Sequence, residues 1–385
     1  MFETLEIIFK NTIIGIIAGV FSMFPINNVQ KEIAIAPIDV VKIGNNYTKT
    51  TSEEGSTATT TESVKKTATT TSKNIKTVTA SKTEPIAIAS TSPRTITLEI
   101  LPLEPLNAQT RSAIVNILCT TQNGGDFKPL SGSGVFISDK GVILTNAHIG
   151  QYFLLRDYGV KNYITCVARQ GSPASPAFLV EPIYVSKKWI TENSKVIKQE
   201  NPTGTGESDY ALLRVVGTPD GRQLPASFPY VEPNIDPENV LRGLPVLIVA
   251  YPAGFLGGVT IQTNLFLTSS SGVIKELFNF HDDTLLDIIS VEGNILSQQG
   301  SSGGAVINLS SGKLEGIITT STATKETSTR ELFAITPGHI SREIKNETGQ
   351  SLNEFISQNL DLAQKNFKES LAKPLMNLLI KEIEG

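Results

Sequence analysis

The stretch QQGSSGGAVI, residues 298–307, decides the fold of this chain. Two adjacent serines stand among three glycines and lead directly into an apolar, β-branched run. Glycine adopts positive φ at little steric cost, so the cluster fits an ordinary turn before a strand. It also fits a loop whose backbone N–H groups converge above a serine hydroxyl and stabilise an oxyanion. A serine nucleophile needs a histidine base and a carboxylate, so the rest of the sequence must separate these interpretations.

Candidate partners for such a serine are few, because the chain has only three histidines: His148, His281 and His339. In GVILTNAHI, residues 141–149, a strand-like run ends in a small-residue turn at His148. In GESDYALLRV, residues 206–215, Asp209 stands just before another apolar run. Each residue alone is typical of a buried or solvated side chain in ordinary structure. Their order, histidine, aspartate and then a serine in a glycine-rich loop, indicates nucleophilic catalysis.

Local sequence texture predicts a mainly β domain. Between about residues 107 and 340, strand-sized β-rich runs alternate with Gly, Pro and Asn clusters. This spacing favours an antiparallel barrel or sandwich over alternating strands and helices. Beyond Pro337, apolar residues from Leu352 to Leu371 recur at helical spacing, and Pro374 should break or kink the run.

Three motifs together resemble the trypsin/chymotrypsin-like serine peptidases, especially the bacterial branch around the high-temperature-requirement proteases. SGSGVFISDKGVILTNAHI, residues 131–149, resembles the segment that leads to the catalytic histidine of that branch. SDYALLRV resembles its Asp-x-Ala-Leu segment, and GSSGGAV resembles its Gly-x-Ser-Gly-Gly motif. VAYPAG (249–254) and TSSSGVI (268–274) resemble strands of the second barrel. The resemblance extends from about residue 113 to about residue 340.

The resemblance implies two six-stranded antiparallel β-barrels, followed here by C-terminal helices, with a catalytic cleft between the barrels. It assigns a triad of His148, Asp209 and Ser302, and the Gly-x-Ser-Gly-Gly frame selects Ser302 over Ser301. The N–H groups of Gly300 and Ser302 would form the oxyanion hole. A histidine with an ordinary pKa of about 6.5 is neutral near pH 7 and can take the serine proton. Asp209 would orient the imidazole.

The sequence departs from the family in two places. Ser301 stands where digestive relatives carry an aspartate that pairs with a newly cleaved N-terminus, so activation by that route is not expected. The residues after Ile340 are too few for the PDZ-type peptide-binding domain that usually follows in the bacterial branch. Leu296 stands six residues before Ser302, at the base of the family's specificity pocket, and suggests an apolar or small side chain in the substrate.

The remaining candidate sites are weaker. Cys119 and Cys166 lack CxxC or Cys/His spacing, which argues against zinc and leaves a disulfide or two buried thiols. Their place on first-barrel strands, which the resemblance implies, favours the disulfide. His281 precedes Asp282 and Asp283, but adjacent side chains cannot easily all face one ion, so we expect a solvated loop. We expect His339 to be structural, and we expect neither a cofactor nor a metal.

Composition and order along the chain predict four regions. Residues 1–30 contain an apolar core that indicates an uncleaved membrane anchor, with a cleaved signal peptide or a cytoplasmic amphipathic helix as alternatives. Residues 31–106 are expected to be a Ser/Thr-rich disordered linker. The peptidase domain is expected over 107–340 and a helical extension over 341–385. A net charge of −4, without a basic stripe, argues against nucleic-acid binding.

The resulting functional prediction is a membrane-anchored or secreted serine endopeptidase that cleaves proteins outside the cytoplasmic membrane. A protease-fold binding or sensor module that does not cleave is one alternative, and a serine esterase is another. The C-terminal helices either pack on their own barrel or mediate oligomerisation. The insertion over Lys187–Glu207 either overhangs the cleft or is a solvent loop.

Overall fold

The computed structural model describes residues 99–122, 129–199, 205–236, 240–280, 285–293, 295–321 and 330–385. It also describes the backbone of three two-residue strands, β1 (Glu32–Ile33), β2 (Val41–Lys42) and β3 (Ile96–Thr97), of which β1 and β3 pair with each other. The expected anchor over residues 1–30, most of the expected linker and His281 lie outside the described residues.

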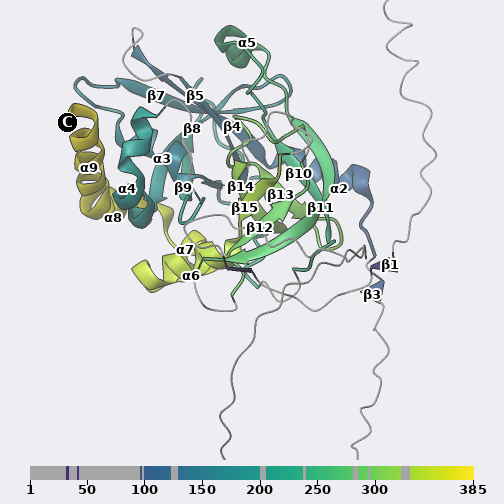
Figure 1. Cartoon of the computed structure of the whole chain (residues 1–385). Coiled ribbons are helices and arrows are strands. Elements are labelled where there is room, and N and C mark those ends of the chain that lie inside the picture. Colours follow the sequence, from purple (N-terminus) through teal and green to yellow (C-terminus); the bar gives the residue numbers. More distant parts are fainter. Residues whose placement is uncertain are drawn as a thin grey trace, which may run out of the picture.

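The first barrel follows helix α2 (Leu103–Ser112) and closes on itself in the order β4-β5-β6-β9-β8-β7. Every neighbouring pair of strands in it is antiparallel. Its strands are β4 (Ile114–Thr121), β5 (Leu130–Phe136), β6 (Val142–Thr145), β7 (Ile164–Gln170), β8 (Ser175–Val185) and β9 (Ala211–Gly217). Figure 1 shows this barrel in teal.

The second barrel is built from strands in the order β10-β13-β14-β15-β12-β11 and closes through antiparallel pairing of β10 with β11. Its strands are β10 (Pro245–Ala250), β11 (Thr268–Asn279), β12 (Ile288–Val291), β13 (Ala305–Asn308), β14 (Leu314–Ser321) and β15 (Leu332–Ile335). The short β2 adds to β11 in a parallel pairing. Two closed six-stranded antiparallel barrels confirm the predicted mainly β, trypsin-like fold.

Short, fully buried strands position the functional loops. Every residue of β6 and of β13 is buried. Burial of a Val, Leu or Ile side chain stabilises the fold by about 1.5–3 kcal/mol, so each of these four-residue strands is firmly fixed despite its length. Because β6 ends just before His148 and β13 begins just after Ser302, both loops start from rigid supports.

Four helices follow the second barrel, as the helical spacing predicted: α6 (Pro337–Thr348), α7 (Leu352–Ser357), α8 (Leu360–Phe367) and α9 (Lys373–Glu384). A π-helical turn over Lys368–Ala372 precedes α9, and Pro374 stands in the first turn of α9. Since α6 begins at Pro337, the expected domain boundary between residues 340 and 341 falls inside a helix. No helix in the described part of the chain is long and apolar enough to cross a membrane.

Helices α8 and α9 pack on the side of the first barrel rather than extending away from the molecule, whereas α6 contacts β14 of the second barrel. Helix α8 contacts β8, and α9 contacts helices α3 (Ala147–Leu154) and α4 (Lys187–Asn193) as well as the 3-10 turn Ser194–Lys198 (Figure 1). Leu375 and Leu379 of α9 are buried in this contact. The first part of the insertion, residues 187–198, is therefore helical, and α9 packs against it.

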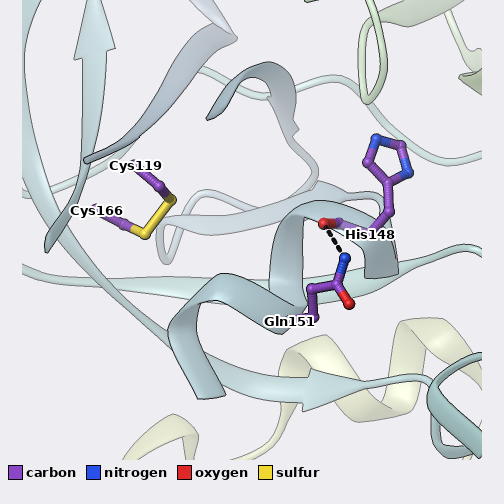
Figure 2. The surroundings of a disulfide bond; sticks show 4 residues. All are labelled: Cys119, His148, Gln151 and Cys166. Atoms are coloured by element: carbon purple, nitrogen blue, oxygen red, sulfur yellow. Dashed lines mark hydrogen bonds between the residues drawn. A yellow bond between two sulfur atoms is a disulfide. The ribbon is translucent and has the colours of Figure 1, made fainter. Parts of the chain in front are cut away.

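A disulfide joins the two cysteines across neighbouring strands of the first barrel. Cys119 of β4 stands directly opposite Cys166 of β7, and their sulfur atoms lie 2.04 Å apart. Figure 2 shows this bond on the β-strands, apart from helix α3, which carries His148. The side chain of Gln151, one turn further along α3, donates a hydrogen bond to the His148 carbonyl at 2.9 Å.

Candidate active site

His148 stands in the first turn of α3, two residues after Asn146, which caps that helix. The Asn146 side-chain amide donates to the Asp209 carbonyl at 3.0 Å, so the start of α3 is tied to the turn before β9. The His148 side chain is 19 % exposed. The histidine is thus fixed at its backbone while its imidazole remains partly accessible.

The Asp209 carboxylate accepts hydrogen bonds from three donors. Its Oδ2 lies 2.8 Å from His148 Nδ1 and accepts from Thr319 Oγ1 at 2.8 Å. Its Oδ1 accepts from the backbone N–H of His148 at 2.9 Å. Because an ionised carboxylate can only accept, the proton of a neutral His148 stands on Nδ1, which leaves Nε2 with a free lone pair. This is the tautomer that a general base requires.

The glycine-rich loop before β13 adopts a backbone that side chains would prevent. Gly300 has φ 87° and Gly303 has φ 79°. A Cβ on Gly300 would lie 2.7 Å from the Tyr251 carbonyl oxygen, and one on Gly303 would lie 2.0 Å from the Ser133 carbonyl oxygen. Positive φ and these close approaches both require glycine, which explains the composition of the loop.

Hydrogen bonds fix the peptide planes on both sides of Gly300. The Gln299 carbonyl accepts from the Ala253 N–H at 2.8 Å, and the Gly300 carbonyl accepts from Ser133 Oγ at 2.8 Å. Among the described residues, the N–H groups of Gly300 and Ser302 donate to no acceptor. The loop therefore holds two available backbone donors next to the serine, as an oxyanion site requires.

Ser133, on β5 of the first barrel, forms hydrogen bonds with the glycine-rich loop of the second barrel. Its N–H donates to the Ser302 carbonyl at 2.7 Å, and its Oγ also accepts from the Tyr251 N–H at 3.0 Å. Thr145 in turn donates to the Ser133 carbonyl at 2.7 Å. Sequence reasoning missed Ser133, Thr145 and Thr319, because nothing local distinguishes these residues from other small polar residues on strands.

His148, Asp209 and Ser302 line one cleft, with a cavity of about 230 Å³. Ser302 is partly exposed, whereas the side chain of Ser301 is completely buried. Trp189, Asn193 and Val196 of the insertion form part of the lining. The insertion therefore borders the cleft, which was one of its two expected positions.

Leu296 lies in the core of the second barrel and is completely buried. It belongs to the same apolar cluster as Ile318 and Leu332, which border the cleft, but Leu296 does not itself line the cavity. Its expected role in substrate selection stays a prediction.

His339 lies away from the cleft, in a buried cluster at the start of α6. Its Nδ1 lies 2.7 Å from Asp287 Oδ1, and its side chain is 4 % exposed. Burial by itself lowers the pKa of His339, but the hydrogen bonds and charges of Asp287 and Glu343 outweigh burial and raise it above its ordinary value. His339 is thus part of an internal ion cluster, in line with the structural role expected for it.

A comparison with known protein families agrees with this fold. Residues 132–317 match the family model described as a trypsin-like peptidase domain. No curated protein matches the sequence.

Solved structures that resemble the chain include three proteases. The active form of the Rv3671c protease from M. tuberculosis is 20 % identical, with a TM-score of 0.39, over 69 % of this chain and 96 % of that one. The HtrA-type protease AlgW with a tripeptide is 18 % identical, with a TM-score of 0.42, over 65 % of each chain. A serine endoprotease from Yersinia pestis is 20 % identical, with a TM-score of 0.41, over 65 % of this chain and 68 % of that one.

The family match covers most of both barrels, from β5 to β14, and includes the histidine, aspartate and serine that the structure brings to one cleft. Residues 132–317 thus form a trypsin-like peptidase domain, and the chain is a serine-type endopeptidase.

Proposed function

We propose that the protein hydrolyses peptide bonds of proteins through a triad of Ser302, His148 and Asp209. The observation that carries the proposal is the His148 Nδ1 to Asp209 Oδ2 contact of 2.8 Å at a cleft that Ser302 also lines. The non-cleaving binding module is disfavoured, because such a module has no physical need for an oriented imidazole in a cleft that an accessible serine also lines.

The proposed reaction proceeds through an acyl-enzyme. Ser302 Oγ attacks the substrate carbonyl carbon while His148 Nε2 takes the hydroxyl proton. The N–H groups of Gly300 and Ser302 donate to the oxyanion of the tetrahedral intermediate. When the C–N bond breaks, the imidazolium returns the proton to the leaving amine. Water then attacks the acyl-enzyme by the same route and releases the free carboxylate and Ser302.

Asp209 remains an ionised carboxylate throughout and stabilises the imidazolium that forms during each step. Thr319 supports this role, since its hydroxyl donates to the same Oδ2 that faces His148. The family assignment and the two free backbone donors favour acyl transfer over other serine chemistry, and peptides are the substrates expected of this domain.

Labelling of the full-length chain with a fluorophosphonate probe tests the nucleophile. Wild type and Ser301→Ala should be labelled, and Ser302→Ala should not. Loss of labelling in Ser301→Ala but not in Ser302→Ala would refute the assignment. An unlabelled, folded wild type would favour the binding module. Matched amide and ester substrates separate a peptidase from an esterase, which would hydrolyse only the ester.

We further propose that the enzyme acts outside the cytoplasmic membrane, held there by the apolar segment within residues 1–30 and the Ser/Thr-rich linker. Accessibility of the peptidase domain to an external protease in intact cells tests this location, and complete protection until the membrane is disrupted would contradict it. Oligomerisation through the C-terminal helices stays a prediction that sedimentation of the full chain can test.

A further inference from the structure

Ser208, directly before Asp209, adopts an unusual backbone conformation. Its φ is 57°, in the left-handed region that non-glycine residues rarely occupy. The residue is completely buried, and its Oγ donates to Glu343 Oε1 at 2.7 Å. A strained residue of this kind persists only where its surroundings hold it in place, and Glu343 supplies the side-chain contact.

Glu343 is itself firmly held in the middle of α6. Its carboxylate lies 3.4 Å from His339 Nε2 and 3.6 Å from Lys188 Nζ, and His339 is held on its other side by Asp287. Burial by itself raises the pKa of Glu343, but the hydrogen bond and charge of His339, with Ser208 and Lys188, outweigh burial and lower it below its ordinary value. Glu343 is therefore an ionised acceptor, and the Ser208 hydroxyl must be the donor.

The turn that contains Ser208 sets the position of Asp209. The Asp209 N–H donates to the Gly206 carbonyl at 3.1 Å, and the Tyr210 N–H donates to the Ser208 carbonyl at 2.9 Å. Any rotation about the Ser208 backbone therefore moves the Cα of Asp209 and the direction of its carboxylate. The carboxylate must keep both His148 contacts within hydrogen-bond distance, so it tolerates little movement.

We propose that Glu343 is a positioning residue for the triad: through Ser208 it holds Asp209 in the orientation that His148 requires. The inference rests on the proposed function, because it assigns a role relative to that triad. It makes the helix after the second barrel a support for a carboxylate that the first barrel supplies. Glu343 touches neither substrate nor the reacting atoms.

Fluorophosphonate labelling kinetics of the full-length chain test the proposal, because they separate the rate at saturating probe from the half-saturating concentration. Glu343→Ala and Ser208→Ala should each lower the saturating rate about tenfold and change the half-saturating concentration less than about twofold. The double variant should be no slower than either single variant, because both remove one hydrogen bond. Glu343→Gln keeps an acceptor for Ser208 and should stay within about threefold of wild type.

A second readout is the NMR signal of the His148 Nδ1 proton, which reports directly on the hydrogen bond to Asp209. Glu343→Ala and Ser208→Ala should shift or broaden this signal, as a purely structural role would not in the folded protein. Glu347→Ala is the matched control, because Glu347 lies one turn further along α6 and accepts from Tyr184 rather than from the Asp209 turn. It should leave both readouts unchanged.

The proposal is overturned if Ser208→Ala labels at the wild-type rate with an unchanged proton signal, or if the two alanine effects multiply in the double variant. Should Glu343→Ala fail to fold, Ser208→Ala and Glu343→Gln still decide the question. A folded wild type that the probe does not label would refute the proposed function instead, and the proton signal would then still test whether Glu343 positions Asp209.

Discussion

Two histidine–aspartate pairs of nearly identical geometry occupy opposite environments. His148 and Asp209 are joined at 2.8 Å, and their side chains are 19 % and 5 % exposed. His339 and Asp287 are joined at 2.7 Å, with exposures of 4 % and 3 %. Both pairs join a buried carboxylate to Nδ1, so the hydrogen bond alone does not distinguish a base from a structural ion.

The difference lies at the second imidazole nitrogen. His339 Nε2 lies near Glu343, so its imidazole is flanked by carboxylates on both sides, and Arg342 joins the cluster through Asp287 at 2.5 Å. A raised pKa then favours the protonated form, which cannot accept a proton. His148 instead lines the cleft that Ser302 also lines. A histidine–aspartate pair becomes a base only where the second nitrogen stays free for a nucleophile.

Exchanging each carboxylate for an amide should separate the two pairs most strongly. Asp209→Asn should lower turnover by about 10⁴-fold, because an amide can hold the imidazole in the wrong tautomer. Asp287→Asn should lower turnover of the folded protein far less, but it should lower the free energy of unfolding by about 3–5 kcal/mol, because it removes one of the two carboxylates beside the buried His339 imidazolium and the carboxylate that pairs with Arg342. Turnover on labelled casein and chemical denaturation measure the two effects. Equal losses of turnover in both variants would contradict the distinction.

The next largest effect is expected in the glycine-rich loop around Ser302, which lies at the cleft of the His148–Asp209 pair and has no counterpart described at the His339–Asp287 pair. Gly300→Ala places a Cβ against Tyr251 and Ala253 at a positive φ, so the loop must move and displace an oxyanion donor. Loss of one such donor costs about 10²–10³-fold in turnover. Ser311→Ala, at an exposed turn position, is a control that should retain activity. Normal turnover in Gly300→Ala would show that this N–H is not part of the oxyanion site.

Each pair also depends on a threonine, and removal of either hydroxyl should have a smaller effect. Thr319→Val deletes the donor to Asp209 Oδ2 and should lower turnover about tenfold, since one such bond contributes about 0.5–1.5 kcal/mol. Thr336→Val removes the side-chain cap of α6, which accepts from the His339 N–H. It should cost about 1 kcal/mol of stability without loss of turnover. Loss of turnover in Thr336→Val, together with normal turnover in Thr319→Val, would contradict the distinction between the two pairs.

The smallest expected effect is a pH dependence of stability that arises from the second pair. The pKa of folded His339 is raised, so its contribution is complete below about pH 6.5 and is lost as the pH rises through the folded value. Burial raises the pKa of Asp287, but His339 and Arg342 outweigh it and lower the value, so the contribution of Asp287 is lost only in acid. The free energy of unfolding should therefore decline from about pH 6.5 upwards in wild type. His339→Gln should flatten that decline, and an unchanged slope would contradict the assignment.

Helical spacing predicted the C-terminal helices, and the strand-sized runs predicted an antiparallel barrel or sandwich. The resemblance to a known family, carried by three motifs, then implied the two barrels and the three residues that meet at the cleft. Those motifs are informative because each ties a functional residue to the end or beginning of a strand. Sequence reasoning could not predict the hydrogen-bond partners of this site. Ser133 and Gly300 are 167 positions apart in the sequence, and Thr319 and Asp209 are 110 positions apart. Such contacts depend on how one barrel packs on the other, which local periodicity does not encode.

The region around His339 shows the same limit. Its structural role followed from a lack of catalytic context, but Asp287 lies 52 positions earlier and carries no motif. Likewise, the helical character of Lys187–Asn193 was not predicted, because its apolar residues are Trp189 and Ile190 alone and they pack on elements distant in sequence.

The contact of α9 with α4 and the 3-10 turn bears on how the protein is made. A ribosome releases His148 and Asp209 first, Ser302 and Thr319 later, and the buried residues Leu375 and Leu379 last. Because α9 packs behind the insertion that borders the cleft, that border is complete only when synthesis has passed these residues. A chain whose synthesis has not yet passed Leu379 therefore lacks the helix that packs against this border of the cleft.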